Sequence, residues 1–253
     1  MLVDKTVLIT GASSGIGQAC AQAFDAAGAR LLLCARREDR LAALIETLRG
    51  ECHTFVLDVR DRPAVDAAVT ALPPPWQDID VLVNNAGLAS GFGPLQEGDP
   101  QDWDRMIDTN VTGLLNVTRA LVPGMVARGR GHVINIGSVA GHETYPGGAV
   151  YCATKAAVDR ITEGLRMDLL GTGVKVSTVD PGLVETEFSV VRFHGDRDRA
   201  DLVYRGMTPL SADDIAEVVV WVADRPAHVQ IAEVLVFPTD QASATRVARS
   251  QTR

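Results

Sequence analysis

The chain has 253 residues, of which 46% are hydrophobic and 22% charged, and its formal net charge is −8. That length and composition fit one large α/β domain with a buried core. The acidic balance leaves no basic footprint for nucleic acid, and no apolar run approaches the length of a membrane span. We therefore expect a small-molecule substrate, with neither nucleic acid nor a membrane as partner.

The cysteines and histidines set further limits. The four cysteines show no metal or redox spacing, and the five histidines include no pair at ligand spacing, so no metal site is expected. The first residues lack the layout of a signal peptide. We expect a protein of the reducing cytoplasm.

Short apolar, β-branched runs alternate with longer amphipathic segments along the chain. The runs predict strands at Thr6–Thr10, Arg30–Ala35, His53–Asp58, Val81–Asn84, His132–Gly137, Lys175–Asp180 and Val234–Phe237. The segments between them predict helices near Gly15–Ala27, Arg37–Arg49, Arg62–Leu72, Asp102–Arg128, Val150–Leu170 and Ala212–Asp224. Continuous apolar strands are typical of parallel sheets that are covered on both faces. The pattern predicts an α/β fold: a Rossmann-type doubly wound sheet of seven mainly parallel strands in a single domain, 1–253.

One stretch, Val184–Leu210, interrupts the alternation before the last helix. It is polar, rich in Arg and Asp, and carries Phe188 and Phe193. A long insertion after the carboxyl end of a strand is where an α/β fold builds a substrate lid. The alternative is an ordinary surface excursion.

A glycine-rich turn separates the first predicted strand from the first helix. Such glycines allow a tight turn and let the backbone approach a pyrophosphate at the helix N-terminus. A structural turn alone is the alternative, but the place between a strand and a helix favours a nucleotide site. The residues expected to bind the cofactor here are Gly11, Ser13, Ser14, Gly15, Ile16 and Gly17.

The end of the second predicted strand indicates which dinucleotide binds. An NAD enzyme usually presents an acid there, whereas this strand ends in Arg36 and Arg37. Two guanidinium groups match a 2′-phosphate, so NADP(H) is the predicted cofactor. Both arginines would otherwise serve only to solubilise the next helix. Asp58 and Val59 close the third strand, where the carboxylate could accept a hydrogen bond from the adenine amine.

Tyr151 and Lys155 lie four residues apart at the start of a predicted helix, so they share one face. A nearby positive charge favours the phenolate, which suits a tyrosine to proton transfer. Ser138 follows the fifth strand and Asn85-Ala86-Gly87 follow the fourth, at the sheet edge where doubly wound folds bind ligands.

With these motifs in this order, the chain resembles the short-chain dehydrogenase/reductase family along essentially its whole length. The matching residues are Thr10–Gly17, Asn84–Gly87, Asn110, Ser138, Tyr151, Lys155, Pro181 and Gly182. The resemblance implies that Ser138 holds the substrate oxygen and that Tyr151 is the proton donor and acceptor. It implies that Lys155 lowers the pKa of the tyrosine and holds the nicotinamide ribose, and that Asn110 anchors a relay water. It also places Pro181, Gly182, Val184 and Thr186 against the cofactor.

A looser similarity links the chain to bacterial NADP-dependent enzymes that oxidise serine, allo-threonine and other 3-hydroxy acids. It rests on Asn84–Ala89, Asp102–Asn110, Thr186–Phe193 and Pro226–Val229, while Gly141–Tyr145 depart from that subgroup. It implies a hydroxy acid substrate, for which Arg192 in the lid would clamp the carboxylate. A surface salt bridge to Asp196 or Asp198 is the other interpretation of Arg192.

Other functions stay open at this point. The same motifs permit an NADPH-dependent reductase of a ketone, an aldehyde or a β-ketoacyl substrate. A nucleotide-sensing protein without turnover and a serine hydrolase built on Ser138 are alternatives from other classes, although Ser138 does not lie in a Gly-x-Ser-x-Gly elbow. The resemblance also implies a homodimer or homotetramer that pairs through Asp102–Arg128 and Val150–Leu170.

Overall fold

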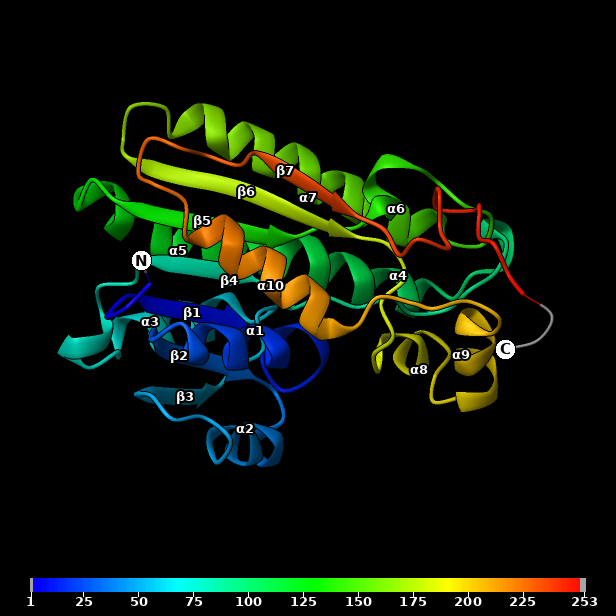
Figure 1. Ribbon diagram of the computed structural model, residues 1–253, viewed down its shortest axis with the longest axis horizontal. Coiled ribbons are helices and arrows are strands. Elements are labelled where there is room, and N and C mark those ends of the chain that lie inside the picture. Colours follow the sequence, from blue (N-terminus) through cyan, green and yellow to red (C-terminus); the bar gives the residue numbers. More distant parts are fainter. Residues whose placement is uncertain (1, 251–253) are drawn as a thin grey trace.

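The computed structural model describes residues 2–250, and its centre is one sheet of seven strands (Figure 1). The strand order is β3-β2-β1-β4-β5-β6-β7, and every neighbouring pair is parallel. The strands are β1 (Thr6–Thr10), β2 (Arg30–Ala35), β3 (Cys52–Val56), β4 (Val81–Asn84), β5 (Gly131–Ile136), β6 (Val174–Pro181) and β7 (Glu233–Val236). The doubly wound prediction is confirmed, with parallel pairing throughout.

Helices cover both faces of the sheet because both faces of its central strands are apolar. They are α1 (Gly15–Ala26), α2 (Glu38–Ile45), α3 (Arg62–Thr70), α4 (Pro100–Ile107), α5 (Leu114–Ala127), α6 (Val139–His142), α7 (Ala149–Asp168), α8 (Phe188–Arg192), α9 (Arg197–Tyr204) and α10 (Ala212–Ala223). Short 3-10 turns lie at Pro74–Trp76 and Leu95–Glu97.

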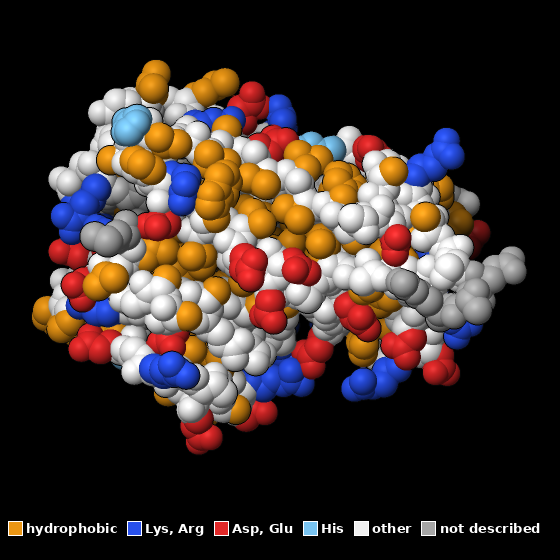
Figure 2. Space-filling view, in the orientation of Figure 1, with side chains coloured by type: hydrophobic (Ala, Val, Ile, Leu, Met, Phe, Trp, Pro, Cys, Tyr) orange, Lys and Arg blue, Asp and Glu red, His pale blue; other side chains and the backbone are white. Residues whose placement is uncertain are grey.

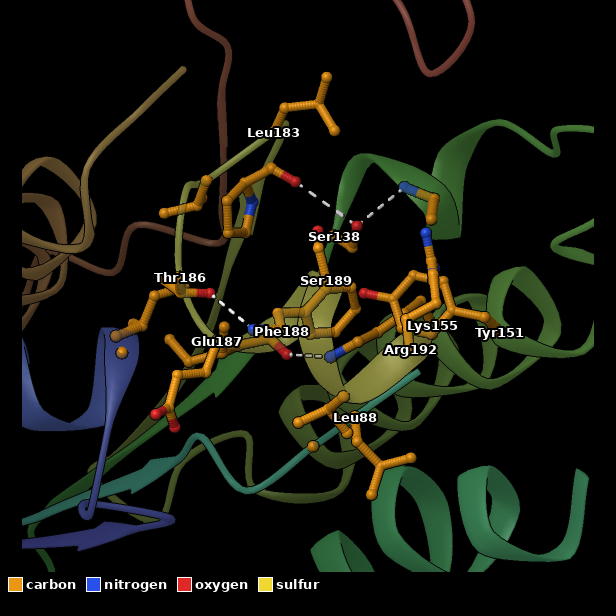
Figure 3. A pocket seen from close by; sticks show the side chains of 18 of the residues that line it. Leu88, Ser138, Tyr151, Lys155, Leu183, Thr186, Glu187, Phe188, Ser189 and Arg192 are labelled. Atoms are coloured by element: carbon orange, nitrogen blue, oxygen red, sulfur yellow. Dashed lines mark hydrogen bonds between the residues drawn. The ribbon is translucent and has the colours of Figure 1, made fainter. Parts of the chain in front are cut away.

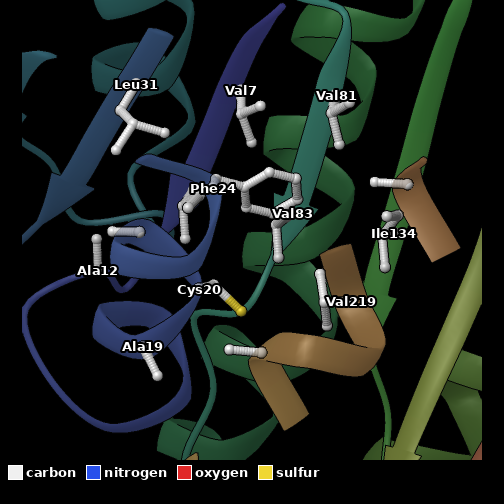
Figure 4. Close-up of a cluster of buried hydrophobic side chains, with 14 of the residues drawn as sticks. Val7, Ala12, Ala19, Cys20, Phe24, Leu31, Val81, Val83, Ile134 and Val219 are labelled. Carbon is white, nitrogen blue, oxygen red and sulfur yellow. The ribbon is translucent and has the colours of Figure 1, made fainter. Parts of the chain in front are cut away.

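Two buried clusters fill the space between the sheet and its helices. On one face, Phe24 of α1 and Val219 of α10 pack with Val83 and Ile134 of the strands (Figure 4). On the other face, Val117, Leu121 and Met125 of α5 pack against the same sheet. This two-sided burial fixes the strands, so that their carboxyl ends all open on one edge.

The predicted helix Asp102–Arg128 is confirmed as one unbroken helical stretch from Pro100 to Ala127, although its middle turn is not α-helical. A π-helix, Asp108–Gly113, separates α4 from α5. The physical reason lies in two positions at which the chain is drawn inward. Asn110 is buried and hydrogen-bonded to the main chain of Leu88, and Gly113 lies so close to Val59 that a Cβ atom there would be 2.6 Å from its side chain. Single π-turns of this kind often lie at functional sites.

The predicted insertion Val184–Leu210 holds two short helices. Both α8 and α9 lie beyond the carboxyl ends of the strands (Figure 1), and the segment is closed at its base by a bridge between Val184 and Leu210. Other boundaries differ by smaller amounts: α2 ends at Ile45 instead of Arg49, and β3 runs from Cys52 to Val56.

Candidate active site

A cleft of about 840 Å³ opens at the carboxyl edge of the sheet. Figure 2 shows it as a hollow between the surface of α1 and α2 and that of α8 and α9. Nearly all residues predicted for the site line this cleft: Gly11, Ser13, Ser14, Gly15, Ile16, Arg36, Arg37, Asp58, Val59, Asn85, Ala86, Gly87, Ser138, Tyr151, Lys155, Pro181, Gly182, Val184, Thr186 and Arg192. Gly17 and Asn110 lie behind its wall.

The glycine-rich turn is shaped by close backbone packing. Gly11 and Gly15 have positive φ angles of +66° and +54°, which L side chains rarely adopt. A Cβ atom on Gly17 would collide with Nδ2 of Asn85, so this glycine serves packing between the turn and β4. The Asn85 side chain donates to the carbonyls of Thr10 and Gly11, at 2.9 and 3.2 Å. The turn is therefore rigid and presents open backbone to a ligand.

Thr10 is a residue of this site that the sequence motifs did not single out for a contact. Its hydroxyl oxygen accepts hydrogen bonds from the N–H groups of Asn85 (3.1 Å) and Ala86 (3.0 Å). These two hydrogen bonds hold the end of β4 against the end of β1. A threonine just before the glycine turn was the only signal available for it.

Positive charge gathers where β2 ends. The Arg37 guanidinium donates to the hydroxyls of Ser13 and Ser14, and pairs with the Glu187 carboxylate at 3.1 Å. Arg40 binds the other oxygen of Glu187 at 2.7 Å. Arg36 also lines the cleft. Two guanidiniums and two hydroxyls around one opening suit a phosphate group.

The carboxylate of Asp58 is held by a neighbouring arginine. Nε of Arg60 lies 3.0 Å from both of its oxygens, and this hydrogen bonding lowers the pKa of Asp58. Asp58 still lines the cleft, so its contact with adenine stays a prediction.

Ser138, Tyr151 and Lys155 come together at one end of the cleft (Figure 3). Ser138 caps α6: its hydroxyl oxygen accepts from the N–H of Ala140 at 3.1 Å and lies 3.4 Å from the carbonyl oxygen of Pro181. Tyr151 and Lys155 follow on the first two turns of α7, and Nζ of Lys155 donates to the carbonyl of Ile136 at 2.7 Å. The sheet edge and one helix face thus bring the three side chains together.

Burial dominates the ionisation of the tyrosine and the lysine. It raises the pKa of Tyr151, while the Arg192 charge and the Ser138 hydroxyl act in the opposite direction. Burial also lowers the pKa of Lys155 to about 8, against the pull of the Asp180 and Asp159 carboxylates. Nearby positive charge is therefore what the site needs in order to make the phenol proton mobile.

Asn110 is 2% exposed and uses its whole side chain inside the protein. Oδ1 accepts from the N–H of Leu88, while Nδ2 donates to the Leu88 carbonyl and to the Thr154 hydroxyl, all within 3.0 Å. Asn110 therefore ties the loop after β4 to α7. Its water-anchoring role stays a prediction.

Arg192 lies inside the cleft, above the ring of Tyr151. Its Cζ is 4.9 Å from the centre of that ring and 5.2 Å from that of Phe188, and Nη2 donates to the Tyr145 hydroxyl at 2.6 Å. Within residues 2–250 it forms no ion pair with Asp196 or Asp198, and its buried Nε has no hydrogen-bond partner. The sequence offered no signal for Tyr145 beyond its place in the segment that departs from the subgroup.

A cluster of one histidine and two aspartates lies beside α7 but does not line the cleft. His142, Asp159 and Asp180 bring a ring nitrogen and two carboxylate oxygens within 4.8 Å of one another. No spacing in the sequence could show this, since the three residues come from α6, α7 and β6.

Comparisons with known proteins agree with a cofactor cleft at this edge of the sheet. Residues 5–196 fit the family model for short chain dehydrogenases. The chain is 50% identical over 239 residues to the NADP-dependent 3-hydroxy acid dehydrogenase YdfG of Salmonella typhi, covering 94% of this chain and 96% of that one. It is also 50% identical over 243 residues to sulfoacetaldehyde reductase 2 of Chromohalobacter salexigens, covering 95% and 96%.

Among solved structures, the closed form of serine dehydrogenase complexed with NADP+ superimposes with a TM-score of 0.93. The two sequences are 44% identical, and the match covers 97% of this chain and all of the other. The chain belongs to the short-chain dehydrogenase family and is an oxidoreductase. Among residues 2–250, no helix is both long and apolar enough to cross a membrane.

Proposed function

We propose that the chain is an NADP(H)-dependent dehydrogenase that interconverts a small hydroxy acid, of the 3-hydroxy acid, serine or allo-threonine type, with its keto or semialdehyde form. The observation that carries this proposal is the place of Arg192, a cation without an acidic partner among the described residues, over the ring of Tyr151 and in the same cleft as Ser138. An anionic substrate would bridge the arginine and the proton-transfer group.

The cofactor fits the residues present at the edge of the sheet. The turn from Gly11 to Gly15 offers free backbone for a pyrophosphate, and Arg36, Arg37 and the two serines would hold the 2′-phosphate. When bound, NADP(H) supplies the hydride that is exchanged with the substrate carbon. Relatives with NADP in their names or as a bound ligand support the same choice.

In this proposal, side chains of the protein bind the substrate oxygen and transfer the proton to and from it. Ser138 would hold the substrate oxygen by a hydrogen bond. Tyr151 would donate its Oη proton to that oxygen during reduction and take it back during oxidation. Lys155 would hold the nicotinamide ribose and, with Arg192, supply the positive charge that makes the phenol proton mobile. Asn110 would keep the neighbouring loop in register with α7 and anchor a relay water.

The names of two relatives point to related anionic substrates. The 3-hydroxy acid enzyme and the sulfoacetaldehyde reductase act on compounds with a carboxylate and a sulfonate, and a guanidinium can bind either anion. We place the carboxylate first, because the serine dehydrogenase superimposes over 97% of this chain.

A substrate screen tests the proposal. NADP+ reduction should be measured with serine, allo-threonine, 3-hydroxyisobutyrate and isethionate, beside NADPH oxidation with a β-ketoacyl thioester and neutral aldehydes. Turnover of hydroxy acids above neutral alcohols is expected. Preference for neutral carbonyls would point to the alternative reductase, and NADPH binding without turnover to a nucleotide-sensing protein.

The cofactor proposal has its own test. Arg36→Asp places an acid where the 2′-phosphate would lie, so NADPH affinity should fall roughly 10–100-fold while NADH affinity is kept or improved. Isothermal titration of both nucleotides to the native chain and the variant measures this. A native preference for NADH would contradict the proposal.

We also propose a single domain over residues 1–253, with the segment 184–210 as its substrate lid, in a cytoplasmic homodimer or homotetramer. Apolar side chains exposed near α5 and α7 support the pairing, namely Ile107, Leu115, Met167 and Leu170, the last of them 88% exposed. Light scattering of the native chain would test the oligomeric state.

A further inference from the structure

The strongest unexplained feature is a buried charged cluster beside Lys155. Nε2 of His142 lies 3.3 Å from Oδ2 of Asp180, 3.8 Å from Oδ2 of Asp159 and 3.9 Å from Oε1 of Glu233. The side chains of Asp180 and Asp159 are 0% and 5% exposed, while His142, at 25%, reaches solvent. None of the four lines the cleft, so the proposed reaction does not use them directly.

The carboxyl groups of Asp159 and Asp180 fit closely into the structure, yet each has a buried oxygen atom without a hydrogen bond within residues 2–250. Oδ1 of Asp159 and Oδ1 of Asp180 are both buried without a hydrogen-bond partner among the described residues. Two glycines make room for them, because a Cβ atom on Gly137 would collide with Asp180 and one on Gly141 with Asp159. Buried acids with open acceptors are costly unless they retain a proton or face a positive charge. Burial raises the pKa of both.

The positive charge that they face is Lys155. Asp159 lies four residues after it on α7, so Tyr151, Lys155 and Asp159 form a line along one helix face. Asp180 approaches across the sheet: Nζ of Lys155 donates to the carbonyl of Ile136, and Val179, just before Asp180, pairs with Ile136 in the β5–β6 ladder. The lysine is thus flanked by an acid along its helix and by another across the sheet.

Charged and titratable groups from the neighbouring elements also act on Tyr151, Lys155 and the two acids. Arg160 and Glu233 act on Asp159, and His142 acts on both carboxyls. On the far side, Arg192 and Tyr145 act on Tyr151. The Asp159–Asp180 pair supplies the negative charge that acts on Lys155 itself.

We infer that Asp159 and Asp180 are positioning residues of the reaction: a buried carboxyl pair, reached from solvent through His142, whose negative charge stabilises the ammonium form of Lys155. The inference rests on the proposed parts of Tyr151 and Lys155. Two carboxyls within 4.8 Å of each other oppose each other's ionisation, so the one that remains after the loss of its neighbour ionises more readily. A variant that loses one carboxyl therefore keeps much of the charge, whereas loss of both removes it.

The composition of the chain allows a direct test, because it has only three lysines, Lys5, Lys155 and Lys175. With 13Cε/15Nζ-labelled lysine, NMR titration follows each ammonium separately, and the signal that Lys155→Met removes is that of Lys155. In Asp159→Asn/Asp180→Asn the pKa of Lys155 should fall by roughly one unit or more, because the acids that favour its charged form are gone. Each single variant should give a smaller shift.

Matched controls separate this effect from general disturbance. Lys5 and Lys175 serve as internal references in every sample. Asp168→Asn removes an exposed acid from the last turn of the same helix, away from the cluster, and should leave the Lys155 pKa unchanged. An unmoved Lys155 in the double variant would overturn the inference. If the double variant does not fold, Asp180→Asn and Asp159→Asn decide: a lowered Lys155 pKa in at least one of them supports the inference, and a Lys155 pKa that neither lowers overturns it.

The pH dependence of kcat/KM gives a second measure of how the two acids affect Lys155. In carbonyl reduction, the alkaline fall of kcat/KM should move to lower pH in the double variant by a similar interval, whereas a merely structural pair would lower the rate at every pH without moving the midpoint. The NMR result does not depend on turnover, so it stays decisive even if no substrate is found. Tight Zn²⁺ binding that His142→Gln abolishes would make the cluster a metal site and overturn the inference.

Discussion

The two sides of the cleft are built in different ways. On the side of β1 and α1, the wall around the glycine turn is main chain: glycines with positive φ, and an asparagine and a threonine that bind carbonyl and N–H groups of neighbouring strand ends. On the lid side, the wall is side chain against side chain, as in the contact of Arg192 with Tyr145, 47 residues away in sequence. A main-chain wall suits the constant parts of a nucleotide, whereas a side-chain wall can change its specificity by single substitutions.

The largest effect is expected where the two sides meet. Tyr151→Phe removes the proposed proton donor, so kcat should fall roughly 10²–10⁴-fold in both reaction directions. The affinity for NADPH, measured by titration, should change little, because the hydroxyl would act on the substrate oxygen. A variant that keeps near-native kcat would remove Tyr151 from the chemistry.

On the lid side, Arg192→Leu should raise KM for a carboxylate substrate by roughly 10–100-fold, the value of a charge-assisted hydrogen bond in a buried site. The matched control is Tyr145→Phe, which removes one partner of the guanidinium while keeping its charge and should raise KM by a smaller factor. Steady-state kinetics on a hydroxy acid and on a neutral alcohol measure both. An equal effect on the two substrates would rule out the anion clamp.

On the main-chain side, Gly17→Ala should destabilise the fold by about 1–3 kcal/mol and weaken NADPH binding, because the new Cβ would collide with Asn85 and the Gly11 carbonyl. Gly164→Ala is the paired control on α7, where a Cβ meets nothing within 4 Å, and should stabilise the helix by up to about 1 kcal/mol. Thermal and urea unfolding report both. Equal tolerance of the two alanines would mean that the glycine turn is not tightly packed.

The smallest effect is expected at the contact that joins the two sides. Glu187 pairs with Arg37 and Arg40, but all three side chains are more than 40% exposed, so Glu187→Gln should cost less than about 1 kcal/mol of stability. The difference should shrink further in high salt, which urea titrations at two ionic strengths would show. A large loss would indicate that this ion pair holds the lid closed.

Local patterns predicted much of this molecule. All seven strands lie within about two residues of their expected positions, because continuous apolar runs are a strong local signal for covered parallel strands. The glycine turn and the line of Tyr151 and Lys155 along one helix face were also readable, since each depends on neighbours within a few residues. The π-helical turn at Asn110 was not, because it arises from contacts of Asn110 with Leu88 and of Gly113 with Val59, on other segments.

By itself, then, the sequence determined the order of strands and helices, the cofactor turn and the chemistry-bearing residues at the strand ends, all of which follow from local geometry. Tertiary structure alone decided that Arg192 turns inward onto Tyr145, that Gly17 packs instead of lining the cleft, and that Asp159, Asp180 and His142 meet beside Lys155. All three depend on contacts between elements far apart in the chain, and the first and the last depend also on the burial of charge. That burial sets both where such groups can lie and how they ionise.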